Sequence, residues 1–128
     1  MKRRAEVIVP ESMKPLPEAH EIEIAEILSQ HYQCVVVFLR PVGSYMTKTP
    51  DIVMNGLEWE IKSPTGMSRN TIQAQFKGRK QSRNLIIDGR RTGIPDEVIM
   101  TRIKLELTKR IRIDRVLFVT KQKRVVEL

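Results

Sequence analysis

The sequence predicts an α/β fold in which a central mixed β-sheet is flanked by helices. Two observations support this prediction. Helix-like and strand-like segments follow one another in the order α-β-β-β-α-β-α-β-β. The run 34–39 is continuously apolar, as expected of a central strand covered on both faces. With 128 residues, 41% of them hydrophobic, the chain is long enough for one domain with a real core.

The first regular element is expected to be a helix that follows an irregular lead-in. Three prolines interrupt residues 1–17, which we expect to form an N-terminal arm to a single domain over 18–128. Pro17 is favourable at a helix start and acidic residues follow it, so the helix should run from there to about Gln33. Glu21 should lie at the edge of its apolar stripe. That stripe consists of Ala25, Leu28 and Tyr32.

The next element is a tight hairpin over about 51–62, signalled by Asn55-Gly56 between apolar residues. Both central residues of a type I′ turn need positive φ, which Asn and Gly tolerate. A two-residue turn would place Asp51 opposite Glu60, and alternation along the strand would put Lys62 on that same face. The other face would be uninterruptedly apolar, and it would consist of Ile52, Met54, Leu57, Trp59 and Ile61.

The second half of the chain predicts two more helices and three more strands. The segments are a loop over 63–70, a helix over about 71–82 capped by Ser68 or Asn70, a strand over 84–88, a basic loop over 89–93, a helix from Pro95 to about Lys109, and strands over 113–119 and 124–128. Apolar spacing predicts that Ile72, Phe76, Ile99, Ile103 and Leu107 face inward.

Composition narrows the classes of function. Lys and Arg number 23 against 15 acidic residues, and the net charge of +8 favours a polyanionic partner. An aromatic content of 5% argues against a stacking platform for single strands. One cysteine, Cys34, and two histidines exclude a Cys/His zinc cluster, and Cys34 is expected to be a buried thiol. No apolar run is long enough to span a membrane, and no signal peptide is recognisable.

The charged face of the hairpin predicts hydrolysis of a phosphodiester. Opposed carboxylates repel each other, and a divalent cation is the usual compensation. Asp51 and Glu60 are the candidate ligands, with the backbone carbonyl of Ile61 as a third. Lys62 would orient or help to deprotonate the attacking water and stabilise transition-state charge. Glu21 would add a further ligand from the first helix. The competing interpretation is an ordinary surface hairpin with solvated charges.

These residues resemble a known family. Asp51 with Glu60-Ile61-Lys62 resembles the PD-(D/E)xK phosphodiesterase signature. The wider string consists of His20-Glu21, Thr49-Pro50-Asp51-Ile52, Glu58-Trp59-Glu60-Ile61-Lys62-Ser63-Pro64, Asn70-Thr71-Ile72 and Gln75-Phe76. Over about residues 18–128 it resembles the C-terminal tRNA-nuclease domain of contact-dependent growth-inhibition toxins of the CdiA type.

The resemblance implies a metal-dependent ribonuclease that cleaves tRNA, built on a restriction-endonuclease-like PD-(D/E)xK core and neutralised by a cognate immunity protein. The implied catalytic set is Glu21, Asp51, Glu60 and Lys62, and the three carboxylates are the expected metal ligands. Mg²⁺ is the expected ion, with Mn²⁺ or Zn²⁺ as alternatives. The expected site of action is the cytoplasm, with export only as part of a larger toxin.

The basic residues are unevenly spread along the sequence. They cluster over 69–83, continue at Arg90 and Arg91, and recur along the last helix. Phosphate contact is favoured for the first cluster, because Lys62 leads into that loop and the following helix would present free N–H groups. The expected substrate-binding residues are Arg69, Thr71, Gln75, Lys77 and Lys80.

Two other functions are compatible with the residues. The same core cuts DNA in other families, so a metal-dependent DNA endonuclease is the first alternative. The second is a non-catalytic basic nucleic-acid-binding module. The opposed carboxylates speak against the second alternative, and the family resemblance alone favours RNA over DNA.

Overall fold

A computed structural model of the chain describes residues 4–40, 49–77, 83–109 and 112–128. The elements in these ranges are β1 (Glu6–Ile8), α1 (Ala19–Tyr32), β2 (Val35–Phe38), β3 (Ile52–Met54), β4 (Leu57–Lys62), α2 (Thr71–Ala74), β5 (Asn84–Asp88), α3 (Asp96–Leu107), β6 (Arg115–Val119) and β7 (Val125–Glu127). The strands form one sheet whose spatial order follows the sequence from β1 to β7. The pairs β1–β2, β4–β5 and β5–β6 are parallel and the other three are antiparallel, so the predicted mixed sheet is confirmed.

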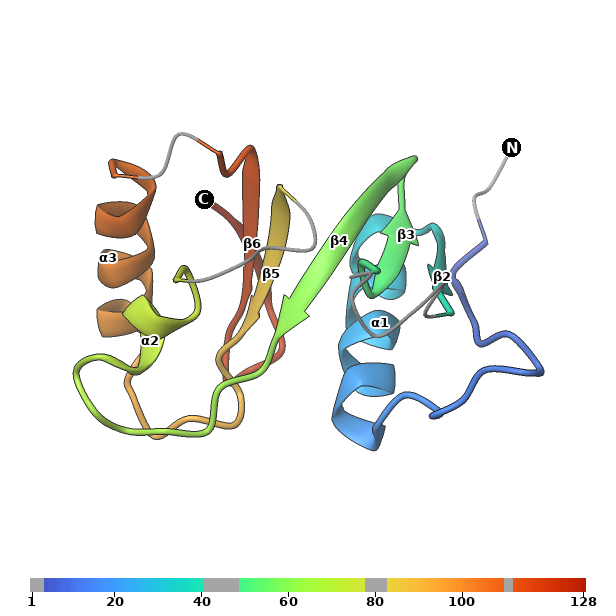
Figure 1. Ribbon diagram of the computed structural model, residues 1–128, viewed down its shortest axis with the longest axis horizontal. Helices are drawn as coiled ribbons and strands as arrows, with labels where there is room; N and C mark the ends of the chain where they lie inside the picture. Colours follow the sequence, from blue (N-terminus) through green and yellow to red (C-terminus); the bar gives the residue numbers. More distant parts are fainter. Residues whose placement is uncertain (1–3, 41–48, 78–82, 110–111) are drawn as a thin grey trace.

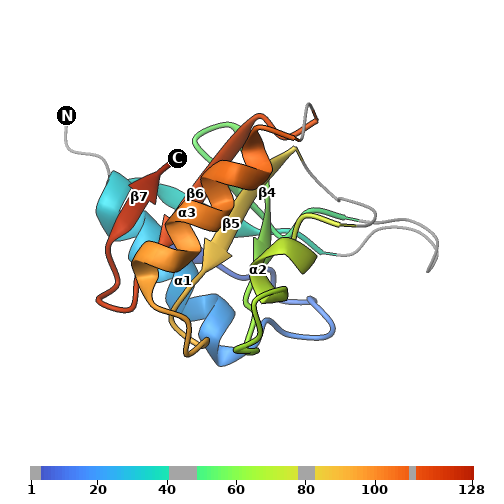
Figure 2. The ribbon, with the colours of Figure 1, turned by 90° about the vertical axis from the view of Figure 1, so that its left-hand side faces the viewer.

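The helices cover opposite faces of this curled sheet. Figure 1 shows α1 beside the half formed by β1 to β3, and α2 and α3 beside the half formed by β5 and β6. In the view turned by 90°, α3 crosses in front of β5 and β6 while α1 lies behind them (Figure 2). The sheet therefore separates two apolar cores, as expected for layered α/β packing.

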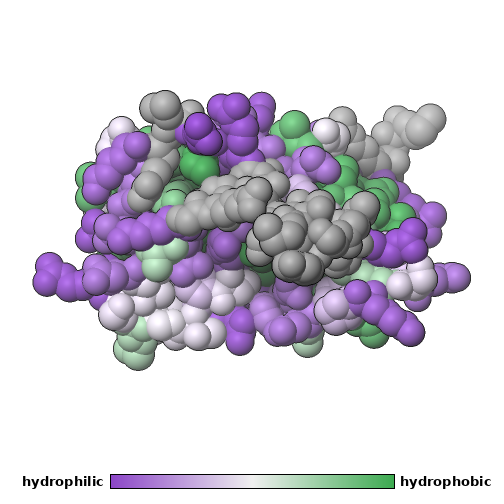
Figure 3. All heavy atoms as spheres, viewed as in Figure 1, coloured by the Kyte–Doolittle hydropathy of each residue, from purple (hydrophilic) through white to green (hydrophobic). Residues whose placement is uncertain are grey.

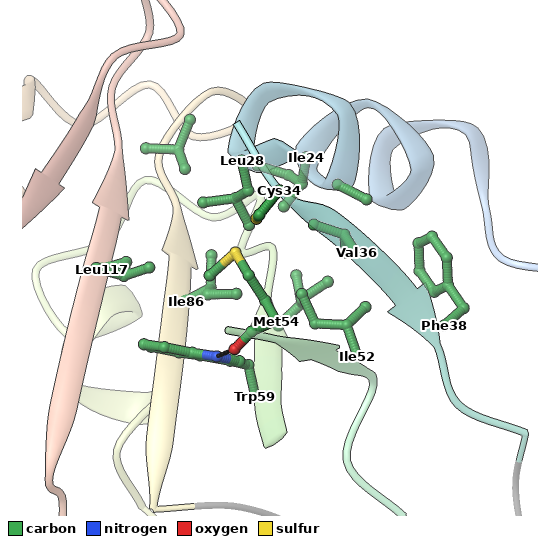
Figure 4. Packing of buried hydrophobic residues seen from close by; sticks show 13 residues of the cluster. Ile24, Leu28, Cys34, Val36, Phe38, Ile52, Met54, Trp59, Ile86 and Leu117 are labelled. Carbon is green, nitrogen blue, oxygen red and sulfur yellow. Dashed lines mark hydrogen bonds between the residues drawn. The ribbon is translucent and has the colours of Figure 1, made fainter. Parts of the chain in front are cut away.

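The core under α1 contains the apolar face predicted for the hairpin. Ile52, Met54 and Trp59 are buried there with Ile24 and Leu28 of the helix (Figure 4). Trp59 also satisfies its polar atom, because its Nε1–H donates a hydrogen bond to the carbonyl of Met54 at 3.2 Å. The predicted burial of the Cys34 thiol is confirmed as well.

The second core lies between the sheet and the helices α2 and α3. The inward positions predicted for these helices are confirmed, since Ile72, Phe76, Ile99 and Ile103 are all buried and Leu107 packs against them. From the sheet this core receives Leu85, Ile87, Val116 and Phe118. Because β5 contributes to both cores, it is buried at all five positions.

The Asn55-Gly56 turn is confirmed, and the predicted register holds for the pairs from Met54–Leu57 to Ile52–Trp59 but not for Asp51 and Glu60. Both residues have positive φ, 54° and 76°, as a type I′ turn requires. The turn pairs Met54 with Leu57 and sets the whole β3–β4 ladder, which ends at the pair Ile52–Trp59. This register turns Trp59 towards the α1 core.

Three details differ from the sequence-based expectations. Residues 6–8 of the expected irregular segment form β1, because this edge strand pairs in parallel with β2 and Val7 packs on the α1 core. Strand β2 is not covered on both faces, since its residues alternate between buried and accessible and Val35 is 38% exposed. Helix α2 ends at Ala74, and Asn70 makes no side-chain capping bond; residues 78–82 lie outside the described part of the chain.

The molecular surface is largely hydrophilic on the face shown in Figure 3. Within the described ranges, no helix combines the length and the apolar character that crossing a bilayer requires.

Replacement of Gly56 by alanine should destabilise the fold. Gly56 has a φ of 76°, and an added Cβ would meet no atom within 4 Å, so the penalty comes from the backbone alone. We expect the free energy of unfolding, measured by urea denaturation, to fall by about 1–2 kcal/mol. Asn55→Gly is the matched control and should change it little, because glycine adopts positive φ freely. Equal stability of Gly56→Ala and the wild type would contradict a type I′ turn.

Candidate active site

Glu60 and Lys62 form a close ion pair on β4. The two positions are in register with Leu85 and Ile87 of β5, and register partners of parallel strands point to the same face, so both side chains lie on the face covered by α2 and α3. The Glu60 side chain is 2% exposed and its Oε2 lies 2.8 Å from Lys62 Nζ. Lys62 keeps 30% of its side chain accessible, so the pair combines a buried anion with a cation that solvent can reach.

Asp51 precedes β3 and is held by the backbone of β4. Its N–H donates to the carbonyl of Trp59 at 2.9 Å, and its Oδ2 accepts a hydrogen bond from the N–H of Ile61 at 2.6 Å. The sequence predicted that Asp51 would be the ladder partner of Glu60. That prediction is wrong, because the β3–β4 ladder ends at the pair Ile52–Trp59. The Asp51 carboxylate instead bonds directly to the backbone between Glu60 and Lys62.

The charges of the other three predicted catalytic residues all act on the pKa of Asp51. This pKa is raised from 3.8 to about 6, and burial is the largest cause. The negative charges of Glu21 and Glu60 contribute to the rise, whereas the N–H of Ile61 and the charge of Lys62 oppose it. Helix α1 and strand β4 thus bring their charges within electrostatic reach of one partly buried carboxyl group.

Glu21 lies in the first turn of α1, where it also stabilises the helix end. Its Oε1 accepts a hydrogen bond from the backbone N–H of Glu18, the residue preceding the helix, at 2.9 Å. This contact is half of a capping box and places a negative charge at the positive end of the helix dipole. Glu21 is therefore anchored by its own helix.

Two of the expected metal ligands fit a magnesium ion. Within the described ranges, no three acidic, histidine or cysteine side chains are grouped so as to hold a metal. Mg²⁺, however, is commonly held by only one or two carboxylates, with water and phosphate oxygens completing its shell. The buried Glu60 and the Asp51 carboxyl, whose pKa is raised partly by Glu60, are a donor set of that kind. Of the expected metal ligands, Asp51 and Glu60 are therefore the two whose surroundings suit a Mg²⁺ ion.

The expected substrate-binding residues follow β4 in a separate segment. Arg69 and Lys77 are exposed. Thr71 lies with its Oγ1 3.2 Å from the Ser68 hydroxyl, and the side-chain amide of Gln75 donates to the carbonyl of Thr71 at 2.9 Å. Lys80 lies outside the described residues. Because α2 is a single turn, it does not provide the extended helix from which an anion site was expected.

The sequence analysis did not predict a buried ionic network that lies between the end of β4 and the start of α1. Asp88, the last residue of β5, is fully buried and receives two side-chain hydrogen bonds from Arg90, at 2.9 and 3.0 Å. Arg90 also bonds to Glu23 of α1. Arg90 is therefore an internal residue, 10% exposed, and not part of an open basic surface. A signal was present in the sequence, since Asp88 ends an otherwise apolar strand and an arginine follows two residues later.

The pKa of Asp51 predicts a pH-dependent contribution to stability. Because the folded-state pKa is raised, the contribution is fully present below pH 4 and is lost as the pH rises through about 6. Asp51→Asn removes this titration. Without divalent ions, we expect the free energy of unfolding of the variant, relative to that of the wild type, to increase by up to about 3 kcal/mol between pH 4 and pH 7. Urea denaturation at both pH values measures the difference.

Glu58→Gln is the control for this comparison, because Glu58 is an exposed acid on β4, in the same hairpin. Its stability relative to the wild type should stay constant over the same pH range. A constant difference for Asp51→Asn would show that Asp51 titrates normally.

Comparison with known proteins identifies the family. The family model described as contact-dependent growth inhibition CdiA C-terminal domain matches residues 48–125, more than half of the chain. No curated protein matches. Among solved structures, the chain is similar to one in a CdiA-CT/CdiI toxin and immunity complex from Burkholderia pseudomallei, with 14% identity, 96% of this chain and 98% of that chain covered, and a TM-score of 0.57. That structural similarity shows a shared fold, and the match to the family model shows that the chain belongs to the contact-dependent growth inhibition CdiA C-terminal domain family.

Proposed function

We propose that this domain is a metal-dependent endoribonuclease that cleaves tRNA and acts as a growth-inhibition toxin. The observation that carries the proposal is the convergence of Asp51, Glu60 and Lys62 at the β3–β4 hairpin, with the charge of Glu21 acting on the same carboxyl group. Two carboxylates and a lysine in this arrangement support the PD-(D/E)xK assignment.

The proposed mechanism assigns one task to each side chain. Asp51 and Glu60 would hold the divalent ion, which would supply an activated water and neutralise charge on the scissile phosphate. Lys62 has its Nζ fixed 2.8 Å from Glu60, so it orients the attacking water and stabilises negative charge as it develops on the phosphate. Glu21 adds negative charge beside Asp51 and favours cation binding.

The substrate assignment combines charge with family membership. A net charge of +8 favours a polyanion, and Arg69 and Lys77 are exposed on the segment that leaves β4. The family resemblance favours tRNA within that class. DNA remains the alternative substrate, because the four charged residues would serve the same chemistry on either backbone.

We also propose that a cognate immunity protein neutralises this domain. The solved complex from Burkholderia pseudomallei contains a toxin and an immunity protein, and this chain shares the fold of a chain in it. Such an inhibitor is required wherever a nuclease of this kind acts in the cytoplasm of a cell that also makes it.

Nuclease assays with matched variants test the proposed chemistry. The purified domain should cleave tRNA in the presence of Mg²⁺, and the cleavage should stop when EDTA is added. Asp51→Asn, Glu60→Gln and Lys62→Met should each lower the cleavage rate by roughly 10²–10³-fold, because each removes a charge used in the transition state. Glu58→Gln alters an exposed acid two residues from Glu60 and should leave the rate unchanged.

Two outcomes would redirect the proposal. Cleavage that survives EDTA, or persists in Glu60→Gln, would exclude the metal mechanism. Cleavage of plasmid DNA with intact tRNA would identify a DNA endonuclease. Calorimetric titration with Mg²⁺ gives an independent readout, since Asp51→Asn should weaken binding even when cleavage is not followed.

Expression inside a bacterium tests the toxin assignment. Induction of the wild-type domain should arrest growth and deplete intact tRNA, whereas Glu60→Gln at equal abundance should do neither, because it lacks the catalytic carboxylate. Colony counts and RNA gels after induction measure both effects. Equal growth arrest by the two proteins would separate toxicity from the proposed nuclease site.

A further inference from the structure

A buried ion pair closes the carboxyl end of β5, next to the candidate site. The side chain of Asp88 is fully buried and that of Arg90 is 10% exposed. The pair is bidentate, with Arg90 Nε 2.9 Å from Asp88 Oδ1 and Nη2 3.0 Å from Oδ2. The backbone N–H of Arg90 also donates to Asp88 Oδ1 at 3.0 Å. Burial of such a pair is tolerated when its remaining donors and acceptors are satisfied, as they are here.

The remaining bonds of this pair reach two other elements. Arg90 Nη2 donates to the backbone carbonyl of His20 at 2.9 Å, and Nη1 bonds to the Glu23 carboxylate. Both residues belong to the start of α1. On the other side, Asp88 Oδ2 accepts a hydrogen bond from the Ser63 hydroxyl at 3.2 Å, directly after the end of β4. One network thus joins the start of α1 to the ends of β4 and β5.

Two of the joined elements, α1 and β4, carry a candidate catalytic residue at the junction. Glu21 lies between His20 and Glu23 on α1, and Lys62 is the neighbour of Ser63. The apolar face of α1 holds the helix against the sheet, but apolar packing is not directional and permits small axial shifts. The directional hydrogen bonds of a planar guanidinium, one to the His20 carbonyl and one to Glu23, oppose such a shift of the first turn.

We propose that Arg90, locked by Asp88, is a positioning residue of the nuclease site. It sets where Glu21 stands relative to Asp51 and does so without touching the substrate. This inference rests on the proposed nuclease function for its kinetic consequences, but its structural claim concerns the first turn of α1 alone.

Arg90→Lys is the sharpest perturbation. Lysine keeps the charge that Asp88 requires, but its single ammonium cannot reproduce a fork that bonds Asp88 in two places and also reaches His20 and Glu23. Displacement of a catalytic group by about 1 Å can lower a rate by roughly 10²-fold. We expect kcat for tRNA cleavage to fall at least tenfold while KM stays within about twofold, because Arg90 does not contact the substrate.

Arg91→Lys is the matched control. Arg91 is the exposed neighbour and makes a single contact with α1, from Nη1 to the ring Nε2 of His20 at 3.0 Å. Its replacement should change kcat less than twofold. A similar loss in both variants would mean that any disturbance of this loop slows the reaction, and it would overturn the assignment to Arg90.

A double-mutant cycle with Glu21→Gln shows whether Arg90 acts through Glu21. If it does, Arg90→Lys should lower kcat by no more than about twofold in the Glu21→Gln background, because the group it positions has already lost its charge. Full additivity of the two losses would contradict the proposal.

Hydrogen exchange tests the structural claim without any substrate. In Arg90→Lys, amides 21–24 should exchange faster while those of α3 keep their wild-type rates. Unchanged exchange at 21–24 would overturn the proposal, whatever the kinetics. If Arg90→Lys does not fold, Ser63→Ala and Glu23→Ala each remove one peripheral partner of the Asp88–Arg90 pair and should raise exchange at 21–24 to a smaller extent. An inactive wild type would disprove the nuclease function, and the exchange experiment would still decide the role of Arg90.

Discussion

The register of the β3–β4 hairpin is the constraint on which the rest of the molecule depends. Side chains alternate along a strand, so a slip of one residue would turn every apolar side chain of β4 away from the α1 core. The two-residue Asn55-Gly56 turn prevents that slip and pairs Ile52 with Trp59. The same alternation brings Glu60 to the opposite face. A single turn therefore settles both where the core lies and where the charged residues lie.

Two ion pairs lie at the ends of adjacent parallel strands, and their basic residues differ in how accessible they are. On β4, Lys62 keeps 30% of its side chain accessible beside the buried Glu60, so its ammonium group is able to meet a ligand. At the end of β5, Arg90 is 10% exposed and its fork is fully used by Asp88 and α1. The lysine ammonium is a compact point charge, which suits the accessible pair. The arginine guanidinium is a rigid planar donor, which suits the buried pair.

The elements that follow from local rules were predictable from the sequence, whereas those that depend on tertiary contacts were not. Turn chemistry gave the hairpin, and apolar periodicity gave the inward faces of α1 and α3. Strand β1 exists because β2 offers it a parallel edge, which no local pattern encodes. Asp51 was expected in the ladder opposite Glu60, but it bonds to the backbone of Ile61 instead. The loop arginine Arg90 read as surface charge because its partners, Glu23 and His20, are 67 and 70 residues away.

The electrostatics of the candidate site bear on the cation proposed for it. The chain carries a net charge of +8, which attracts a polyanion over a distance, yet the residues gathered around Asp51 are mostly acidic. Among the charges that act on Asp51 in the described part of the chain, those of Glu21 and Glu60 would repel an approaching phosphate and that of Lys62 would attract it. Burial raises the pKa of Asp51 and the charges of Glu21 and Glu60 add to the rise, so the site favours an added positive charge even before substrate arrives. In the proposed function, a divalent ion would supply that charge where a proton would otherwise bind, and it would turn a locally repulsive site into one that a phosphodiester is able to enter.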